Sequence, residues 1–122
     1  MEDLPDEALD QVAAYFQALS EPTRLRILNL LRKQERSVGE LAQLCGYSSA
    51  NISRHLTLLT QHGLVTRESR RNSAIYTIAD ESVYSLCDLV CGNIARQFDR
   101  KANARAAFIT PTTPAPKRAK AR

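Results

Sequence analysis

Apolar residues recur at helical spacing from Pro5 to Leu19, and again from Pro22 to about Arg32. Between the two segments, Ser20-Glu21-Pro22 provides a capping residue followed by a proline suited to a first helical turn. The pattern therefore predicts two consecutive helices. Their apolar positions are Leu9, Val12, Ala13, Phe16 and Leu19 in the first segment, and Leu25, Ile27, Leu28 and Leu31 in the second.

The next segment predicts two helices joined by a short turn. Ser37 and Glu40 have the spacing of a capping box, which predicts a third helix that ends at Gly46. A fourth helix is expected to start near Ser48 and to stop at Gly63. Its apolar residues Ile52, Leu56 and Leu59 share one face, so the opposite face is small and polar. That polar face consists of Ala50, Ser53, Arg54, Thr57 and Gln61.

Apolar and polar residues alternate in LVTRESR and in SAIYTI, which predicts two β-strands. The intervening Arg70-Arg71-Asn72-Ser73 gives this ribbon a basic tip. Asp80 is expected to cap a last, long helix that reaches Phe98 or beyond. The predicted fold is therefore mainly α, with five helices and a two-stranded β-ribbon.

One folded domain is expected, residues 1–108, followed by a disordered basic tail, residues 109–122. The tail contains TPTTPAPKRAKAR, whose prolines and lack of large apolar residues cannot support a packed fold. The chain has 17 lysine and arginine residues against 13 acidic residues, a net charge of +4. Lys117, Arg118, Lys120 and Arg122 account for that excess, so the tail makes the chain basic.

Neither export nor a membrane span is indicated by the sequence. It has no run of about 18 apolar residues that would cross a membrane. The acidic N-terminus, MEDLPDEALD, lacks the layout of a secretory signal. Cys45, Cys87 and Cys91 are an odd number of cysteines, so reduced thiols are expected rather than a disulfide framework. These features predict a cytoplasmic protein.

Short polar side chains are concentrated in YSSANISRHL, at the start of the fourth helix. Short side chains let a helix approach its partner closely, and the major groove of DNA, about 12 Å wide, admits one α-helix. Hydroxyl, amide and guanidinium groups near the N-terminal end of such a helix read base edges. We therefore interpret Ser48, Ser49, Asn51, Ser53 and Arg54 as DNA contacts. For any single serine, the alternative is a solvated surface position.

Three stretches of the chain resemble the ArsR/SmtB family of winged helix-turn-helix repressors. They are ALSEPTRLRILNLL, VGELAQLCGYSSANISRHLTLLTQHGLV and the strand AIYTI. The resemblance covers about Phe16 to Ala95. It implies homodimers that pair through the first and last helices and bind a palindromic operator. It also implies release from DNA by a metal, a metalloid or a thiol-oxidising signal.

The resemblance carries DNA contacts over residue by residue. The positions on the family's recognition helix are Ser48, Ser49, Asn51, Ser53, Arg54 and His55, and those at the tip of its wing are Arg70 and Arg71. His55 lies toward the flank, where a histidine also packs or bonds locally. Thr23 and Arg24 are candidate phosphate contacts, with an ordinary helix cap and a surface charge as the alternative.

Two ligand sets of the family are absent from this chain. The Cys-x-Cys-x-x-Cys cluster of its arsenic sensors falls on Ser37, Gly39 and Ala42. Of the zinc ligands on the family's last helix only Asp80 is present, whereas Ser82, Asn93 and Arg96 fill the other positions. Cys45 is expected in the core, because free cysteine packs as a small hydrophobe.

Cys87 and Cys91 remain as candidate metal ligands on the last helix. Residues four apart on a helix have Cβ atoms about 5 to 6 Å apart, so both thiols point the same way. That separation is too long for an unstrained disulfide. Soft thiolates favour trivalent arsenic or antimony, or another thiophilic ion, as the inducer, and no other cofactor is expected. Two alternatives remain open: packing in a dimer seam beside Val83, Leu86, Val90 and Ile94, and sensing of oxidants through the same thiols.

The predicted function is transcriptional repression rather than catalysis. The sequence has no phosphate-cradling glycine loop and no nucleophile elbow, and neither histidine has an evident acid or cysteine partner. A constitutive, chromatin-type DNA-binding protein is a further alternative, suggested by the KRAKAR tail. The expected partners are double-stranded operator DNA and a second copy of the chain.

Overall fold

The computed structural model describes residues 2–109, and the chain divides into two compact units, Met1–Val83 and Tyr84–Arg122. The predicted disordered tail, residues 109–122, lies outside the described residues except for Ile109. Ile109 is the last residue of a helix, so the helical part extends one position past the predicted boundary at Phe108.

Two helices open the first unit, as the apolar spacing predicts. α1 spans Asp6–Leu19 and α2 spans Pro22–Lys33, with Pro22 in the first turn of α2. The carboxylate of Glu21 accepts a hydrogen bond from the backbone N–H of Arg24 at 3.0 Å, so Glu21 is the residue that caps α2. The expected apolar face of α2 is partly wrong, because Ile27, Leu28 and Leu31 are buried but Leu25 is exposed.

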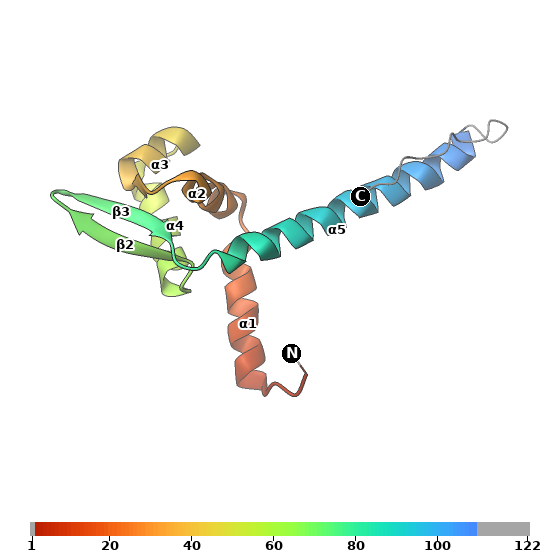
Figure 1. Cartoon of the computed structure of the whole chain (residues 1–122), viewed down its shortest axis with the longest axis horizontal. Helices are drawn as coiled ribbons and strands as arrows, with labels where there is room; N and C mark the ends of the chain where they lie inside the picture. The colour runs from red at the N-terminus through yellow and green to blue at the C-terminus, as the bar shows by residue number, and fades with distance from the viewer. Residues whose placement is uncertain (1, 110–122) are drawn as a thin grey trace. The chain divides into compact units, whose positions relative to one another are not determined.

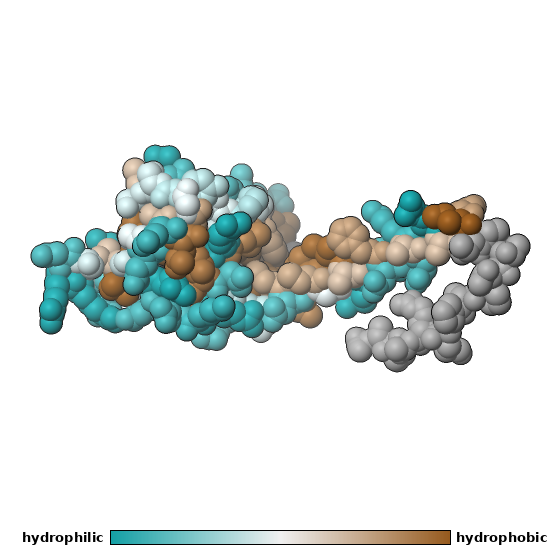
Figure 2. Space-filling view, turned by 90° about the horizontal axis from the view of Figure 1, so that it is seen from above, coloured by the Kyte–Doolittle hydropathy of each residue, from teal (hydrophilic) through white to brown (hydrophobic). Residues whose placement is uncertain are grey.

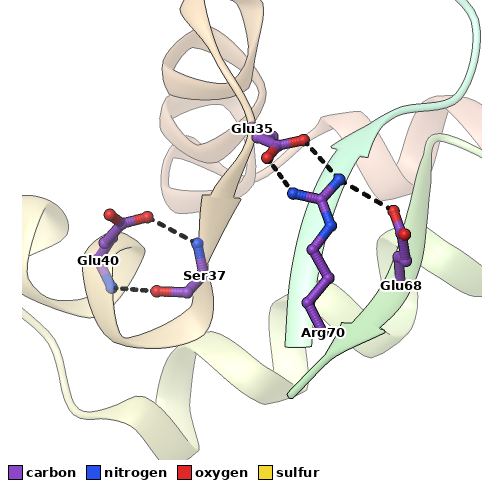
Figure 3. Close-up of polar contacts among 5 residues, drawn as sticks. All are labelled: Glu35, Ser37, Glu40, Glu68 and Arg70. Atoms are coloured by element: carbon purple, nitrogen blue, oxygen red, sulfur yellow. Dashed lines mark hydrogen bonds and ion pairs between the residues drawn. The ribbon is translucent and has the colours of Figure 1, made fainter. Parts of the chain in front are cut away.

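The predicted helix-turn-helix is confirmed in α3, Val38–Cys45, and α4, Ser49–Gln61. The Ser37 hydroxyl accepts from the backbone N–H of Glu40 at 3.1 Å, and the Glu40 carboxylate accepts from the backbone N–H of Ser37 at 2.8 Å (Figure 3). These two bonds are the capping box that starts α3. Gly46 ends α3 with a left-handed backbone, φ 76°, which a residue without Cβ adopts at little cost.

Three antiparallel strands form the sheet, in the order β1-β3-β2. β2, Val65–Arg70, and β3, Ser73–Ile78, make the predicted ribbon, here called the wing, with Val65 opposite Ile78 and Arg70 opposite Ser73. The third strand, β1, is only Arg36–Ser37 and pairs with the other edge of β3. The prediction of two strands missed β1, because two residues are too few to show alternation.

Buried apolar side chains from α2, α3, α4 and the wing, together with Val83 at the start of the last helix, form the core of the first unit. Figure 1 shows α2, α3, α4 and the wing gathered together. The most deeply buried side chains are Ile27, Leu41, Ile52, Leu56, Leu59, Val65 and Val83. The predicted core face of α4 is confirmed, because Ile52, Leu56 and Leu59 are each 0% exposed. The small polar face of α4 is therefore the one turned away from the core.

α5 spans Ser82–Ile109 as one continuous helix (Figure 1) and reaches well past Phe98. The carboxylate of Asp80 accepts from the backbone N–H of Ser82 at 2.9 Å, which confirms its predicted role at the helix start. This hydrogen bond lowers the pKa of Asp80. Within residues 2–109, none of the helices combines the length and apolar character that crossing a membrane requires.

Candidate nucleic-acid interface

The N-terminal end of α4 carries the densest group of predicted DNA contacts. Ser48 is its capping residue, and the Ser48 hydroxyl accepts from the backbone N–H of Asn51 at 3.1 Å. The first turn contains no acidic side chain. Free backbone N–H groups and the helix dipole make such an end attractive to phosphate.

The outer face of α4 is open to solvent next to this end. Ser49 and Arg54 are exposed, and Ser53 is partly exposed. The Arg54 guanidinium has no hydrogen bond or ion pair with any other residue of the described chain. Its five N–H donors are therefore available to a base edge or a phosphate.

Asn51 is oriented differently from its neighbours. The oxygen of its side-chain amide is buried and lacks a hydrogen-bond partner within the described residues. An asparagine that reads adenine uses both the oxygen and the nitrogen of its amide. Asn51 must therefore turn its side chain outward before it can read a base in this way.

His55 lies in the middle of α4, and its side chain is bound within the protein. Nδ1 of His55 is 3.2 Å from a guanidinium nitrogen of Arg24, which lies at the start of α2. Thr23, the other phosphate candidate at that end of α2, is buried. The spacing of apolar residues could not reveal the pairing of His55 with Arg24, because their positions are distant in the sequence.

The two arginines at the tip of the wing have different surroundings. Arg71 is exposed and adopts φ 55°, an uncommon backbone conformation for a residue with a side chain. Arg70 binds the carboxylates of Glu35 and Glu68 (Figure 3). Hydrogen bonds from Arg70 lower the pKa of Glu35, and hydrogen bonds to both carboxylates raise the pKa of Arg70. The free charge at the tip is therefore that of Arg71.

Glu35 is the residue of this surface that the sequence did not single out. It lies two residues after the end of α2 and reaches across to Arg70 at the end of β2. Its neighbour Arg36 begins β1 and donates to the backbone oxygen of Leu30 at 3.2 Å, which holds the same segment against α2. Recognition of β1 would have brought Glu35 next to the wing, but a strand of two residues leaves no such signal.

The cysteines differ in their exposure. Cys45 is buried, as expected, and burial raises the pKa of its thiol, while the charge of Arg26 acts in the opposite direction. On α5, Cys87 is partly exposed and Cys91 is exposed. Within the described residues no three His, Cys, Asp or Glu side chains are grouped to hold a metal ion. In this part of the chain, Cys87 and Cys91 are the cysteines that solvent reaches, whereas Cys45 is buried.

Apolar surface accompanies these thiols along α5, where Figure 2 shows brown residues on much of the helix. Val90 and Ile94 are exposed, and Leu89 and Phe98 are more so. Along α1 and the residues just before it, a shallow groove is lined by Leu4, Ala8, Gln11, Val12, Tyr15 and Phe16. Exposed apolar patches of this kind mark interaction sites.

Comparison with known proteins identifies related chains over these same elements. Residues 19–68, which include α2, α3 and α4, match a family model described as a helix-turn-helix domain. The HTH-type transcriptional regulator Rv0081 of Mycobacterium tuberculosis H37Rv is 38% identical over 85 residues, which are 69% of this chain and 75% of that protein. The "Probable mercury resistance operon repressor" of Streptomyces lividans is 32% identical over 77 residues, which are 63% of this chain and 62% of that protein.

Two solved structures share the fold. The crystal structure of Rv0081 from M. tuberculosis has a TM-score of 0.71 and 34% identity, and covers 82% of this chain and 99% of that one. The solution structure of Mb0332 from Mycobacterium bovis has a TM-score of 0.70 and 33% identity, over 82% of this chain and 95% of that one. Mb0332 is described as a homodimeric winged helix-turn-helix DNA-binding domain and a possible ArsR-family transcriptional regulator.

Proposed function

Since the chain belongs to the ArsR/SmtB family of winged helix-turn-helix transcriptional regulators, we propose that it is a homodimeric repressor. It binds operator DNA through α4 and the wing, and it leaves the DNA when a thiophilic ion binds Cys87 and Cys91. The observation that carries the DNA-binding part is the outer face of α4, which is small, polar and free of carboxylates in its first turn.

On DNA, α4 enters the major groove with Ser48, Ser49, Ser53 and Arg54 toward the bases. Asn51 joins them after its side chain turns outward. Arg71, and Arg70 when released from its carboxylates, approach the phosphates beside the groove. Phosphate contacts fix the register of the protein on the DNA, whereas base contacts give sequence preference.

Dimerisation follows from the apolar surfaces of α1 and α5, which are exposed in a single chain. A dimer places two copies of α4 about 34 to 36 Å apart, the spacing of successive major grooves on one side of the duplex. A small change in that distance weakens both contacts together. An inducer that acts on α5 at the dimer seam can therefore release the whole protein.

The ion proposed here is soft, because its ligands are thiolates one helical turn apart. Two thiolates suit a linear two-coordinate ion such as mercury(II), and the likeness to a mercury resistance repressor supports this class. Arsenite and antimonite take three donors and would need a third from the partner subunit or from solvent. Driving a protein from 99% to 1% DNA-competent takes about 5.5 kcal/mol of differential binding.

The experiment is a gel shift on the DNA upstream of its own gene, with mercury(II), arsenite, antimonite, cadmium, zinc and peroxide added in turn. We expect a thiophilic ion to release the wild type. Cys87→Ser and Cys91→Ser should bind DNA but ignore the ion, whereas Cys45→Ser should still respond. A response lost only in Cys45→Ser would place the site elsewhere.

Oxidant sensing is the second candidate, and the exposure of Cys91 favours it because an exposed thiol is open to oxidation. A disulfide between Cys87 and Cys91 would distort the helix, so a bridge would join two subunits. Release by peroxide but by no ion, together with a covalent dimer on a non-reducing gel, would favour this candidate. If neither ions nor peroxide release the protein, the two cysteines are packing residues.

A further inference from the structure

Arg24 connects three elements of the first unit through one side chain. Its Nε donates to the backbone oxygen of Ala18 at 2.6 Å, and one terminal nitrogen donates to that of Gln17 at 3.3 Å. These carbonyls belong to the last turn of α1, where helix carbonyls lack partners within the helix. The other terminal nitrogen is 3.2 Å from Nδ1 of His55 on α4. Arg24 therefore joins the end of α1 to the middle of α4.

The bond between Arg24 and His55 sets the protonation state of the imidazole. A guanidinium carries only donors and stays charged, so Nδ1 of His55 must be the acceptor nitrogen of a neutral ring. A protonated imidazole has N–H on both nitrogens and cannot accept. Histidine is the side chain that changes its charge between about pH 5 and 8. Acidification that protonates His55 replaces this hydrogen bond with two adjacent cations.

Glu21 is the other charged group that faces His55, also from the start of α2. Burial would raise the pKa of Glu21, but hydrogen bonds from the backbone N–H groups of Arg24 and Thr23 lower it overall, together with the charge of His55 when it is protonated and the charge of Arg24. From α1, the guanidinium meets carbonyl oxygens only. Within the described chain, no charged side chain of α3 or β2 has a hydrogen bond or ion pair with His55.

We propose that Arg24 is a positioning residue for the recognition helix: it holds α4 through neutral His55, and protonation of His55 releases α4 and weakens operator binding. The proposal rests on the role of α4 in DNA recognition proposed above. His55 directly follows Arg54 and lies two residues after Ser53, so loss of its hydrogen bond to Arg24 displaces two of the side chains that face the bases. Because hydrogen bonds weaken steeply with misalignment, a small displacement is enough.

A positioning role for His55 and a direct DNA contact by His55 predict opposite changes in operator affinity on acidification. If His55 bound a phosphate, its protonation would add a positive charge at the interface and would strengthen binding on acidification. If His55 instead accepts from Arg24, acidification weakens binding. The direction of the change therefore separates the two roles.

The experiment measures operator affinity by fluorescence anisotropy from about pH 5.5 to 8, at constant salt and without metal ions. We expect the affinity of the wild type to fall about tenfold toward the acid end, the equivalent of one hydrogen bond to a charged group. His55→Asn supplies a side-chain oxygen near Nδ1 that accepts without titrating. Its operator affinity should not change across this pH range. The control is His62→Asn, which changes the other of the two histidines in the chain and should keep the wild-type profile.

A second variant tests Arg24 itself. Arg24→Lys keeps the charge but cannot bond to the α1 carbonyls and the imidazole at once. We expect a folded protein, checked by thermal unfolding, with about tenfold weaker operator binding at pH 8 and no pH dependence. Wild-type affinity in Arg24→Lys would mean that Arg24 acts only as a charge.

Other outcomes would also overturn the positioning role. These are stronger binding at acid pH, a flat wild-type profile, or a profile that His62→Asn abolishes. Arg54→Ala, measured alongside, distinguishes the two proposals. If it binds the operator like the wild type, the assignment of α4 to DNA fails. If it binds weakly while the wild-type profile is flat, only the positioning role of Arg24 fails.

Discussion

Those residues of α4 whose role depends on their position in the helix alone could be identified from the sequence. Ile52, Leu56 and Leu59 were predictable as core residues because helical periodicity alone brings them to one face. The roles of Asn51 and His55 were not, because each depends on groups from another part of the chain. The bond from Arg24 to His55 exists only after α2 has packed on α4, and the amide oxygen of Asn51 is buried only in the folded protein.

Ser53 and Arg54 allow the sharpest test of base recognition. Replacing either by alanine should cost about 1 to 3 kcal/mol of binding free energy at the operator if that residue reads a base. Binding to random DNA should change little, because the phosphate contacts remain. The measurement is a pair of titrations, on operator and on random DNA at one salt concentration. An equal loss on both DNAs would make the residue a phosphate contact.

Among the elements, helix boundaries were more predictable than partners across the sheet. The capping box of Ser37 and Glu40 and the left-handed Gly46 follow from local sequence, so α3 was predicted at both ends. The exposure of Leu25 and the presence of β1 were not predictable from local sequence. Both depend on which other elements lie next to these residues in the folded chain. In particular, β1 exists because an edge of β3 was left for Arg36 and Ser37 to pair with.

The ion pair between Glu35 and Arg70 predicts how a mutation of Glu35 changes DNA binding by the wing. Glu35→Gln removes one carboxylate that competes with DNA for Arg70, and Glu68 remains as a weaker anchor. We expect tighter operator binding and a steeper salt dependence, by up to about one unit of log K against log salt. Glu7→Gln on α1 makes the same charge change away from the wing and is the control. Weaker binding in Glu35→Gln would mean that Arg70 only holds the wing in place.

The stability that the Glu35–Arg70 ion pair contributes decreases at acid pH. The pKa of Glu35 is lowered in the folded protein by its hydrogen bond from Arg70. The ion pair therefore contributes stability above the unfolded pKa of a glutamate, and this contribution is lost as pH falls through the lower folded value. Near neutral pH the Glu35–Arg70 ion pair stays formed, so the pH dependence proposed for His55 can be measured without interference from Glu35.

At the scale of the whole molecule, a single chain exposes large apolar side chains on α5 that a dimer would bury. Ile94 belongs to the predicted stripe of α5 and is exposed, as are Val90 and Phe98. Ile94→Glu should give a monomer by analytical ultracentrifugation and should bind the operator much more weakly, because one α4 reads only one half-site. The control Asn93→Glu adds the same charge one position away and should stay dimeric. A dimeric Ile94→Glu protein would show that the stripe is not the seam.

The basic tail tests how much of the binding is independent of sequence. Deletion of residues 110–122 removes Lys117, Arg118, Lys120 and Arg122, which account for the whole net charge of +4. Each cation that neutralises a phosphate contributes about 0.9 to the slope of log K against log salt on duplex DNA. If all four do so, the slope per chain should fall by about 3 to 4 units, with equal losses on operator and random DNA. Dimerisation and the discrimination between the two DNAs should survive, because α1, α4 and α5 are intact.

The measurement is a salt series on both DNAs for the full chain and for the deletion. An unchanged slope would mean that the tail does not contact DNA, and a loss confined to the operator would give the tail a part in recognition.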